Sequence, residues 1–214
     1  AQWHINSFAV AYDGNGNTGG TAPSDPSSPY AYNSDATVLG NSGGLAKTGY
    51  SFSGWNTAAN GSGTSYSASD TFKVTSDTTL YAKWVANTHT VTYDGNGQTS
   101  GAAPTDSSSP YNYDSTVTVL GNTGGLVKTG YIFEGWNTAA NGSGTTYAPA
   151  ATFTITGDVT LYAIWHIDSF TVNYDGNGST GGTVPLDVSS PYTYNSTVTV
   201  LDNTGSLVRT GYTF

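Results

Sequence analysis

The 214-residue chain contains no cysteine, no methionine and a single glutamate, Glu134. Without cysteine it forms neither disulfide bonds nor thiolate metal sites, so each folded unit must be stabilised by its own core. Without methionine it lacks an initiator residue, and we expect a segment of a longer or processed protein. A signal peptide or a membrane anchor is not to be sought in such a segment.

Charge is scarce as well. Only 9% of the residues are charged, against about a quarter in an average soluble protein. Five basic residues face 14 acidic ones, for a formal net charge of -9. This balance argues against nucleic acid or an anionic membrane surface as a partner, and against direct membrane insertion of this segment. Gly, Ser, Thr and Asn dominate between short apolar runs, which is typical of an extracellular or cell-surface β protein.

Helical periodicity is also missing. No window of ten residues combines an apolar period of 3.6 with freedom from Gly and Pro. A single helical turn near Asn122 to Val127 is the best candidate. The sequence therefore predicts a mostly β fold.

What the chain does have is a repeat of 81 residues. Tyr12, Tyr93 and Tyr174 each open the string Tyr-Asp-Gly-Asn-Gly, and Trp3, Trp84 and Trp165 keep the same spacing. A fixed period of this length indicates tandem modules that fold independently and form an elongated rod in which neighbouring repeats are partners. The predicted domains are the end of a preceding repeat (1–3), module 1 (4–84), module 2 (85–165) and an incomplete module 3 (166–214).

Short strands fill each module. Phe8 to Tyr12 places a large residue at every second position, which predicts a half-buried strand. The Asp-Gly-Asn-Gly that follows predicts a hairpin turn. Ser115 to Leu120 is a second β-branched strand, and we expect five or more strands per module. The predicted core of the second copy is Leu126, Tyr131, Phe133, Trp136, Phe153, Ile155, Leu161 and Trp165.

A loop rich in Ser, Pro and Tyr precedes the second strand in every copy. Exposed loops often carry binding residues. Two tyrosines recur in this loop, so we predict a partner-contact surface formed by Tyr30, Tyr32, Tyr111, Tyr113, Tyr192 and Tyr194.

The tryptophans allow two interpretations. Trp55 and Trp136, flanked by Asn and Thr, form either a sugar-stacking platform or part of the core, and the core is the commoner place for such a residue. Trp84 and Trp165 lie near module ends, where they would pack between neighbours and stiffen the array.

Catalytic and metal-binding motifs are not apparent. Asp13 to Asn17 superficially resembles the start of a calcium loop, but the Gly and Glu that an EF-hand needs further on are absent. No Ser-His-acid set or paired carboxylate recurs. We therefore expect no enzyme activity, no cofactor and no metal site.

Four asparagines head glycosylation sequons in predicted surface turns. They are Asn60, Asn141, Asn177 and Asn195.

The string Lys-Thr-Gly-Tyr-x-Phe-x-Gly-Trp-Asn-Thr, closing with Leu-Tyr-Ala-x-Trp, resembles the Listeria/Bacteroides repeat, the B-repeat module of internalin B-like proteins. It covers Lys47 to Trp84 and Lys128 to Trp165. The resemblance implies small β-grasp-like domains arranged in tandem on secreted or surface-attached proteins, without enzyme activity. The loop between Asn17 and Thr37 makes these units longer than is usual in the family. Arg209 replaces the two lysines in the third copy, which argues against a Lys-Asn isopeptide bond.

Three functions follow as hypotheses. The leading one is a stalk of a prokaryotic cell-surface or secreted protein, which acts as spacer and as a multivalent surface for a protein or glycan ligand. The second is the subunit of a self-assembling extracellular filament or sheath. The third is a carbohydrate-binding repeat array.

Overall fold

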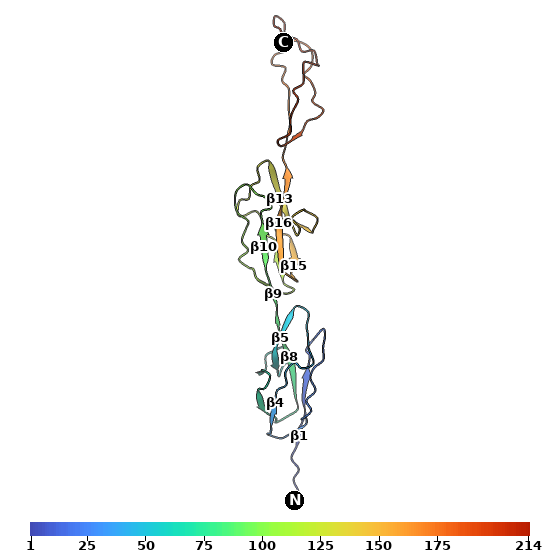
Figure 1. The fold of residues 1–214 in the computed structure, drawn as a ribbon, viewed down its shortest axis with the longest axis vertical. Helices are drawn as coiled ribbons and strands as arrows, with labels where there is room; N and C mark the ends of the chain where they lie inside the picture. The colour runs from blue at the N-terminus through green and yellow to red at the C-terminus, as the bar shows by residue number, and fades with distance from the viewer. The chain divides into compact units, whose positions relative to one another are not determined.

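The structure, a computed structural model, describes residues 1–214 and contains strands but no helix (Figure 1). This confirms a mostly β fold built from tandem repeats. The first repeat comprises β1 (Ser7–Phe8), β2 (Val10–Asp13), β3 (Tyr30–Ala31), β4 (Asp35–Thr37), β5 (Tyr50–Asn56), β6 (Ser65–Tyr66), β7 (Thr71–Lys73) and β8 (Thr78–Ala86).

The second repeat has the same eight strands in the same order. They are β9 (Thr88–His89), β10 (Val91–Asp94), β11 (Tyr111–Asn112), β12 (Thr116–Thr118), β13 (Tyr131–Asn137), β14 (Thr146–Tyr147), β15 (Thr152–Thr154) and β16 (Val159–Ile167). Both repeats exceed the five strands expected from the sequence.

A mixed four-stranded sheet forms the centre of each complete repeat. In the first repeat the strand order is β2-β8-β5-β6, and in the second it is β10-β16-β13-β14. The outer strand β2 runs parallel to β8, with Val10 opposite Thr78, whereas β5 is antiparallel to both β8 and β6. Two-stranded ribbons complete each repeat. The finer assignment as a β-grasp-like domain stays a prediction.

The predicted hairpin after Phe8 to Tyr12 is wrong. The chain does turn at Gly14, whose carbonyl accepts the Asn17 amide at 3.2 Å. It does not return alongside β2, however, because β2 takes its hydrogen-bonded partner from the other end of the repeat.

A bulge in β5 explains why Trp55 and Asn56 are both buried although they are neighbours in a strand. The register with β8 shifts between Phe52 and Trp55, and Gly54 lies there with φ of 121°. The bulge interrupts the alternation of inward and outward side chains. A Cβ on Gly54 would lie 2.7 Å from the carbonyl oxygen of Tyr66, so glycine is required.

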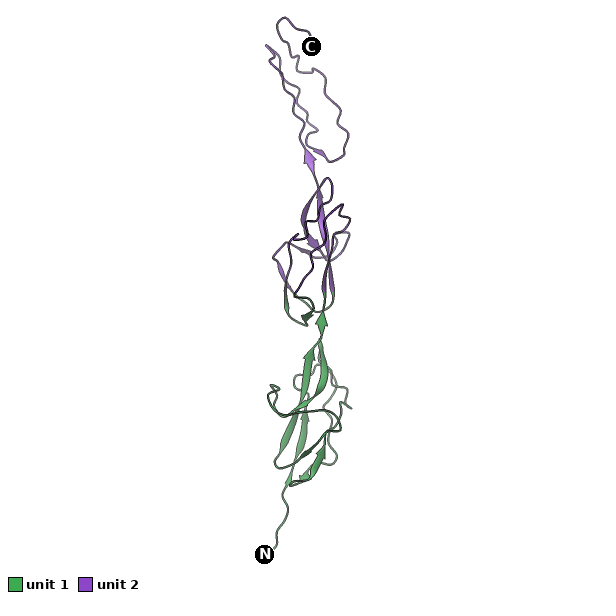
Figure 2. Cartoon of the chain, turned by 90° about the vertical axis from the view of Figure 1, so that its left-hand side faces the viewer, with its two compact units in different colours: residues 1–90, 108–116, 154–158 green, residues 91–107, 117–153, 159–214 purple.

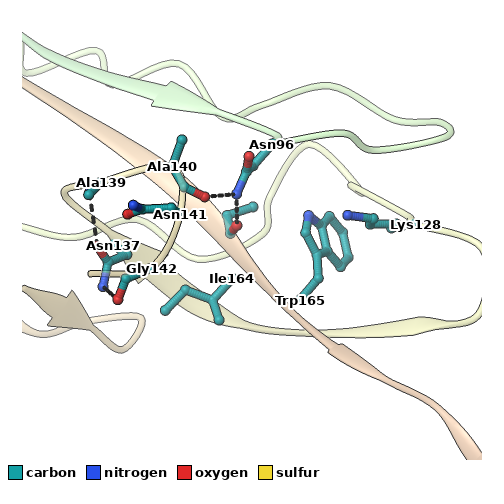
Figure 3. A pocket seen from close by; sticks show the side chains of 10 residues that line it. Asn96, Lys128, Asn137, Ala139, Ala140, Asn141, Gly142, Ile164 and Trp165 are labelled. Atoms are coloured by element: carbon teal, nitrogen blue, oxygen red, sulfur yellow. Dashed lines mark hydrogen bonds between the residues drawn. The ribbon is translucent and has the colours of Figure 1, made fainter. Parts of the chain in front are cut away.

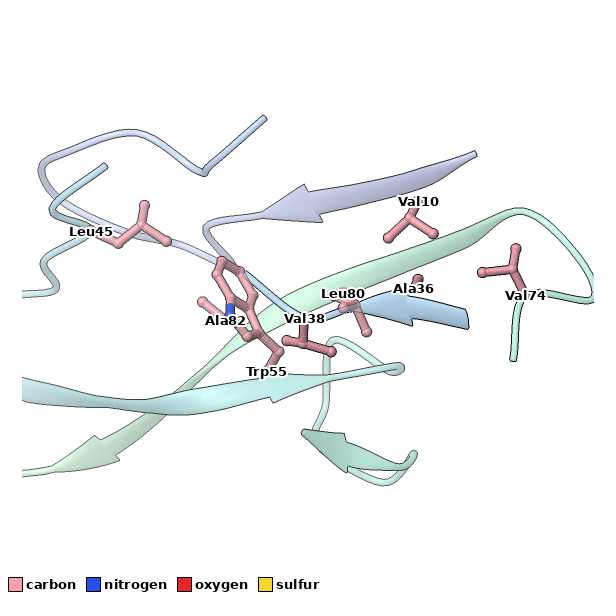
Figure 4. Close-up of a cluster of buried hydrophobic side chains, with 8 residues drawn as sticks. All are labelled: Val10, Ala36, Val38, Leu45, Trp55, Val74, Leu80 and Ala82. Atoms are coloured by element: carbon pink, nitrogen blue, oxygen red, sulfur yellow. The ribbon is translucent and has the colours of Figure 1, made fainter. Parts of the chain in front are cut away.

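The core of the first repeat gathers around Trp55, which is fully buried (Figure 4). Its ring contacts the rings of Tyr12 and Phe52 edge-on, at centroid distances of 4.8 and 5.2 Å. The Tyr12 hydroxyl in turn accepts the Leu39 amide at 2.8 Å. The buried cluster consists of Val10, Ala36, Val38, Leu45, Trp55, Val74, Leu80 and Ala82.

Four members of the predicted second core are confirmed as buried, namely Leu126, Trp136, Ile155 and Leu161. The other four, Tyr131, Phe133, Phe153 and Trp165, are only half-buried. The prediction omitted buried Val91, Val117, Val119 and Ala163.

No helical turn forms between Asn122 and Val127, so that prediction is wrong. The Asn122 side chain closes this loop instead, accepting the Leu126 amide at 2.6 Å and donating to the Leu126 carbonyl at 2.8 Å. Asn41 and Asn203 hold the equivalent loops in the same way.

The third repeat contains only one ribbon, β17 (Ser169–Phe170) with β18 (Tyr192–Thr193). Leu186, Val188 and Val200 of this repeat are exposed.

Two compact units can be distinguished (Figure 2). Unit 1 contains residues 1–90, 108–116 and 154–158, and unit 2 contains residues 91–107, 117–153 and 159–214. The module boundaries at 84/85 and 165/166 stay predictions; β8 and β16 each continue two residues past them.

Candidate functional site: a repeated cleft and the contacts between repeats

A cleft recurs at the same place in both complete repeats, and we call it the repeat cleft. In the first repeat it has a volume of about 400 Å³ and is lined by Asn15, Lys47, Tyr50, Asn56, the 58–61 loop, Ala82, Lys83 and Trp84, with Lys83 replaced by Ile164 in the second repeat. In the second it has a volume of about 180 Å³ and is lined by Asn96, Lys128, Asn137, the 139–142 loop, Ala163 and Trp165 (Figure 3). Its residues come from segments far apart in the repeat, which only the fold brings together.

One wall of the cleft is the turn after β2. The Asp13 carboxylate accepts the Asn15 amide at 2.7 Å and holds Asn15 at a positive φ of 47°. The Asn15 side chain then donates to the carbonyls of Ala59 and Ala82, both at 2.9 Å. Asn96 makes the same two bonds to Ala140 and Ala163. This asparagine thus ties the turn to the opposite loop and to the central strand.

The opposite wall is the loop after β5, and buried Asn56 holds it. The Asn56 amide donates to the carbonyls of Gly61 and Gly63, and its oxygen accepts the amides of Ala58 and Gly63. Asn137 repeats this pattern in the second copy. Because the bonds fix the loop backbone, the shape of the cleft is set by a side chain beneath it.

A cation and an indole stand side by side in the cleft, as Lys128 and Trp165 do in Figure 3. The Lys47 and Lys128 ammonium groups lie over the rings of Tyr50 and Tyr131, 5.0 and 4.8 Å from their centroids. Neither lysine forms a salt bridge; the lysine salt bridge of the chain joins Lys73 to Asp35. The Trp84 and Trp165 indole N–H groups donate to the carbonyls of Gly14 and Gly95.

Trp55 and Trp136 belong to the core, so a sugar platform on these two residues is wrong. Both are fully buried, and their indole N–H groups donate to the carbonyls of Leu39 and Leu120 at 2.8 Å. Trp84 and Trp165 were expected to pack between neighbouring modules. Their ring contacts, to Phe52 and Phe133, instead lie within their own repeats.

The two tyrosines of the predicted contact loop have different surroundings. The first of each pair, Tyr30, Tyr111 or Tyr192, is half-buried in a short strand. The Tyr30 hydroxyl donates to Asp25 and the Tyr192 hydroxyl to Asp187, each at 2.9 Å. Burial, and then the bond to the Asp25 carboxylate, raise the pKa of Tyr30. For Tyr192 the bond to Asp187 is the main cause of a raised pKa.

The second tyrosine reaches residues of the preceding repeat. Within unit 1, the Tyr113 ring packs on Gly49, where a Cβ would collide with it, and lies edge-on to Tyr50 at 6.0 Å. Within unit 2, Tyr194 packs on Gly130 in the same way. In the first repeat the equivalent Tyr32 is 53% exposed. The role of all six tyrosines as a partner-contact surface stays a prediction.

One linker residue joins the backbones at each of these contacts. The Asn87 amide donates to the Gly49 carbonyl at 2.9 Å, and the Asn87 carbonyl accepts the Tyr113 amide at 2.7 Å. Asp168 bridges Gly130 and Tyr194 with the same two distances. We call each set, Gly49-Asn87-Tyr113 and Gly130-Asp168-Tyr194, a joint.

The four sequon asparagines are all exposed. Asn60 and Asn141 accept the backbone amide and the hydroxyl of the serine two residues later, the latter at 2.7 Å. Asn177 is the counterpart of Asn15, whose amide is already bonded in the complete repeat. Asn195 lies at a positive φ of 63°. Glycosylation of these residues stays a prediction.

The Asp13 carboxylate, considered above as part of a calcium loop, caps its own turn. No group of three or more His, Asp or Glu side chains is placed to hold a metal ion. The fold also has no helix long and apolar enough to cross a membrane.

Sequence reasoning missed the cleft and the joints. The cleft had one available signal: Lys47, Lys128 and Arg209 occupy the same position of the repeat and make up three of the five basic residues in the chain. The joints had a weaker one, the Gly-Tyr pair at Gly49, Gly130 and Gly211. Neither pattern says which distant segment the residue faces.

Comparison with known proteins agrees with this arrangement of repeats. Two proteins of Evansella cellulosilytica are similar to the chain: one named "Putative Gly-rich membrane protein", 40% identical over 80% of the chain, and one named "Putative membrane protein", 35% identical over 77%. The chain spans only 20% and 23% of the lengths of these relatives. No solved structure matches it.

The family model of the Listeria-Bacteroides repeat domain matches three segments of the chain, residues 8–83, 89–164 and 170–214. These matches follow the 81-residue period and include the residues of both repeat clefts except Trp84 and Trp165, which lie one residue past the matched segments. The chain therefore belongs to the Listeria-Bacteroides repeat family.

Proposed function

We propose that the chain is a non-enzymatic segment of a prokaryotic cell-surface or secreted protein, in which tandem repeats act as spacer and as multivalent binding surface. The names of the relatives as membrane proteins support a place at the cell envelope. The low content of charged residues and the lack of cysteine are compatible with it.

The joints support the role of spacer. A spacer has to transmit the position of one module to the next, and a linker without local contacts would not do so. Here Asn87 and Asp168 each bond to residues of two successive repeats. An aromatic ring packed on glycine closes each joint.

The repetition of one cleft supports multivalent binding, and it is the observation that carries the proposal. Asn15, Lys47 and Trp84 recur as Asn96, Lys128 and Trp165 in the same arrangement. Sites that are weak alone gain apparent affinity when they engage one extended surface together. Catalysis would not require the same site in successive modules.

Retention as a function of repeat number tests the proposal. Beads would carry equal surface densities of chains with one, two or four complete repeats, and retention on cells of the source organism under flow would be measured. Avidity predicts retention that rises more steeply than in proportion to repeat number. A chain with both clefts altered at Lys47 and Lys128 is the matched control for length.

Retention that is flat or merely proportional to repeat number would contradict the binding part. Light scattering on the same chains addresses the filament hypothesis. Ordered polymers at micromolar concentration would replace the spacer proposal by self-assembly.

A further inference from the structure

The basic residues of this acidic chain are concentrated at one position of the repeat. Three of the five basic residues, in a chain of net charge -9, are Lys47, Lys128 and Arg209. All three lie over a tyrosine ring, with Arg209 4.4 Å from the centroid of Tyr212. Each of these cations thus contacts a tyrosine ring and forms no salt bridge.

The carboxylate nearest to the cleft, that of Asp13 or Asp94, caps its own turn by accepting the Asn15 or Asn96 amide. No Asp or Glu lines the cleft in either complete repeat. Asn60 and Asn141 lie exposed on its rim, where their side-chain oxygens accept hydrogen bonds from Ser62 and Ser143 while their amide nitrogens donate none. An ammonium and an amide donor beside an indole are groups that bind a carboxylate and hydroxyls of one small ligand.

We propose that each repeat cleft binds one carboxylate-bearing sugar residue, and that successive repeats bind along an acidic polysaccharide. The inference rests on the proposed function and names the ligand class of its multivalent surface. The ammonium of Lys47 or Lys128 takes the carboxylate, the rim asparagine donates to a hydroxyl, and the indole contacts the apolar side of the sugar ring.

The size of the clefts suits a small ligand group better than a folded partner. Their volumes, about 400 Å³ in the first repeat and about 180 Å³ in the second, lie near or below the lower end of the range of about 300–1,000 Å³ for pockets that enclose a drug-sized ligand. One pyranose ring fits a cleft of this size, and the neighbouring sugars of a polymer would extend into solvent.

Calorimetric titration of the whole chain with tetragalacturonate, and with the neutral galactose tetramer, tests the proposal. We expect binding of the acidic oligosaccharide alone. The double variant Lys47→Ala/Lys128→Ala should bind about tenfold or more weakly, as loss of one charge-assisted hydrogen bond per site requires. Lys47→Arg/Lys128→Arg should retain affinity within about threefold, because Arg209 stands naturally at this position.

Lys73→Ala is the matched control, since it removes the same charge outside the cleft. Thermal unfolding of each variant checks that the repeats remain folded. If the alanine variant does not fold, the arginine variant is compared with the unaltered chain in its place. Equal weakening by Lys73→Ala would overturn the proposal in favour of diffuse attraction. Equal binding of the neutral tetramer, or of tetraglutamate, would overturn the assignment to an acidic sugar.

The two proposals fail separately. If retention on cells rises steeply with repeat number but no acidic oligosaccharide binds, only the ligand class is wrong. If tetragalacturonate binds each cleft while retention does not depend on repeat number, the multivalent function is wrong and the site remains.

Discussion

A single methyl group at Gly49 is expected to disrupt the joint. Gly49 has φ of 76°, which costs a non-glycine residue about 1–2 kcal/mol, and an added Cβ would collide with Tyr113. Gly61 has nearly the same φ, 77°, with nothing within 4 Å of an added Cβ. Gly49→Ala should therefore lower the free energy of unfolding by about 1 kcal/mol more than Gly61→Ala. The difference corresponds to the contribution of one aromatic contact, here the contact of Tyr113.

Chemical denaturation of the two variants, followed by tyrosine fluorescence, measures this difference. Equal destabilisation by the two variants would mean that the contact between the Tyr113 ring and Gly49 does not contribute to stability.

The Tyr93 hydroxyl accepts the Leu120 amide, with an N to O distance of 2.9 Å. Tyr93→Phe keeps the ring against Trp136, at a centroid distance of 4.7 Å, but leaves that amide without its acceptor. We expect a loss of about 1–3 kcal/mol in the free energy of unfolding. Tyr162→Phe, which alters a half-buried tyrosine of the same repeat, is the control, and a loss no larger than the control would contradict the prediction.

Alkaline pH should lower the stability of the repeat, because the ionised form of the buried Tyr93 side chain is disfavoured by desolvation. Burial raises the pKa of Tyr93, as it does that of Tyr12. A tyrosine whose pKa is raised on folding contributes stability that is complete below its unfolded pKa of about 10 and is lost as the pH rises through the folded value. Unfolding titrations between pH 8 and pH 11 should therefore show a decline above about pH 10 that is smaller in Tyr93→Phe. Identical profiles would contradict this.

At the scale of elements, Asn96 couples the turn after β10 to β16. Asn96→Ala removes two hydrogen bonds, to the carbonyls of Ala140 and Ala163. Asn177 has a similar positive φ and the same Asp cap, but its side chain makes neither of these two bonds. Comparison of Asn96→Ala with Asn177→Ala thus separates those bonds from backbone strain.

We expect Asn96→Ala to cost about 1–3 kcal/mol more than Asn177→Ala. Hydrogen exchange of the 139–142 loop should rise only in the first variant. Exchange that is unchanged there would show that the loop does not depend on this amide.

Strand positions could be predicted from the sequence, but strand partners could not. The alternation in Phe8 to Tyr12 marks a half-buried strand, as observed for β2. The same alternation occurs in a strand of a hairpin and in a strand with a parallel partner, so it did not identify β8 as the partner of β2. The roles of Asn56 and Asn122 could not be predicted, since the several bonds that each side chain makes depend on a backbone shape that only the folded loop has.

At the scale of the whole molecule, the two complete repeats should be protected alike from hydrogen exchange. They contain the same eight strands and the same order of strands in the central sheet. Amides with equivalent strand partners and equivalent burial open at similar free energy. Mass spectrometry should show equivalent peptides from 8–52 and 89–133 exchanging at similar rates, and a large difference would contradict this.

The repeat architecture was the most predictable property at this scale, because an exact 81-residue period needs no knowledge of folding. The cleft was the least predictable. It depends on Asn15, Lys47 and Trp84, which are separated by more than 30 residues at each step and meet only through the sheet. The tryptophan that lines the cleft is accordingly Trp84, whereas a sugar platform was one of two interpretations for Trp55, which is buried.

The parallel pairing of β2 with β8 determines how a repeat responds to mechanical force. The chain enters the repeat at the start of β2 and leaves it at the end of β8, and these strands are hydrogen-bonded neighbours running in one direction. Tension along the chain pulls them in opposite directions along their length. All the hydrogen bonds between them are then loaded in shear at once instead of opening one after another, and a repeat built in this way resists stretching by flow or by an attached cell.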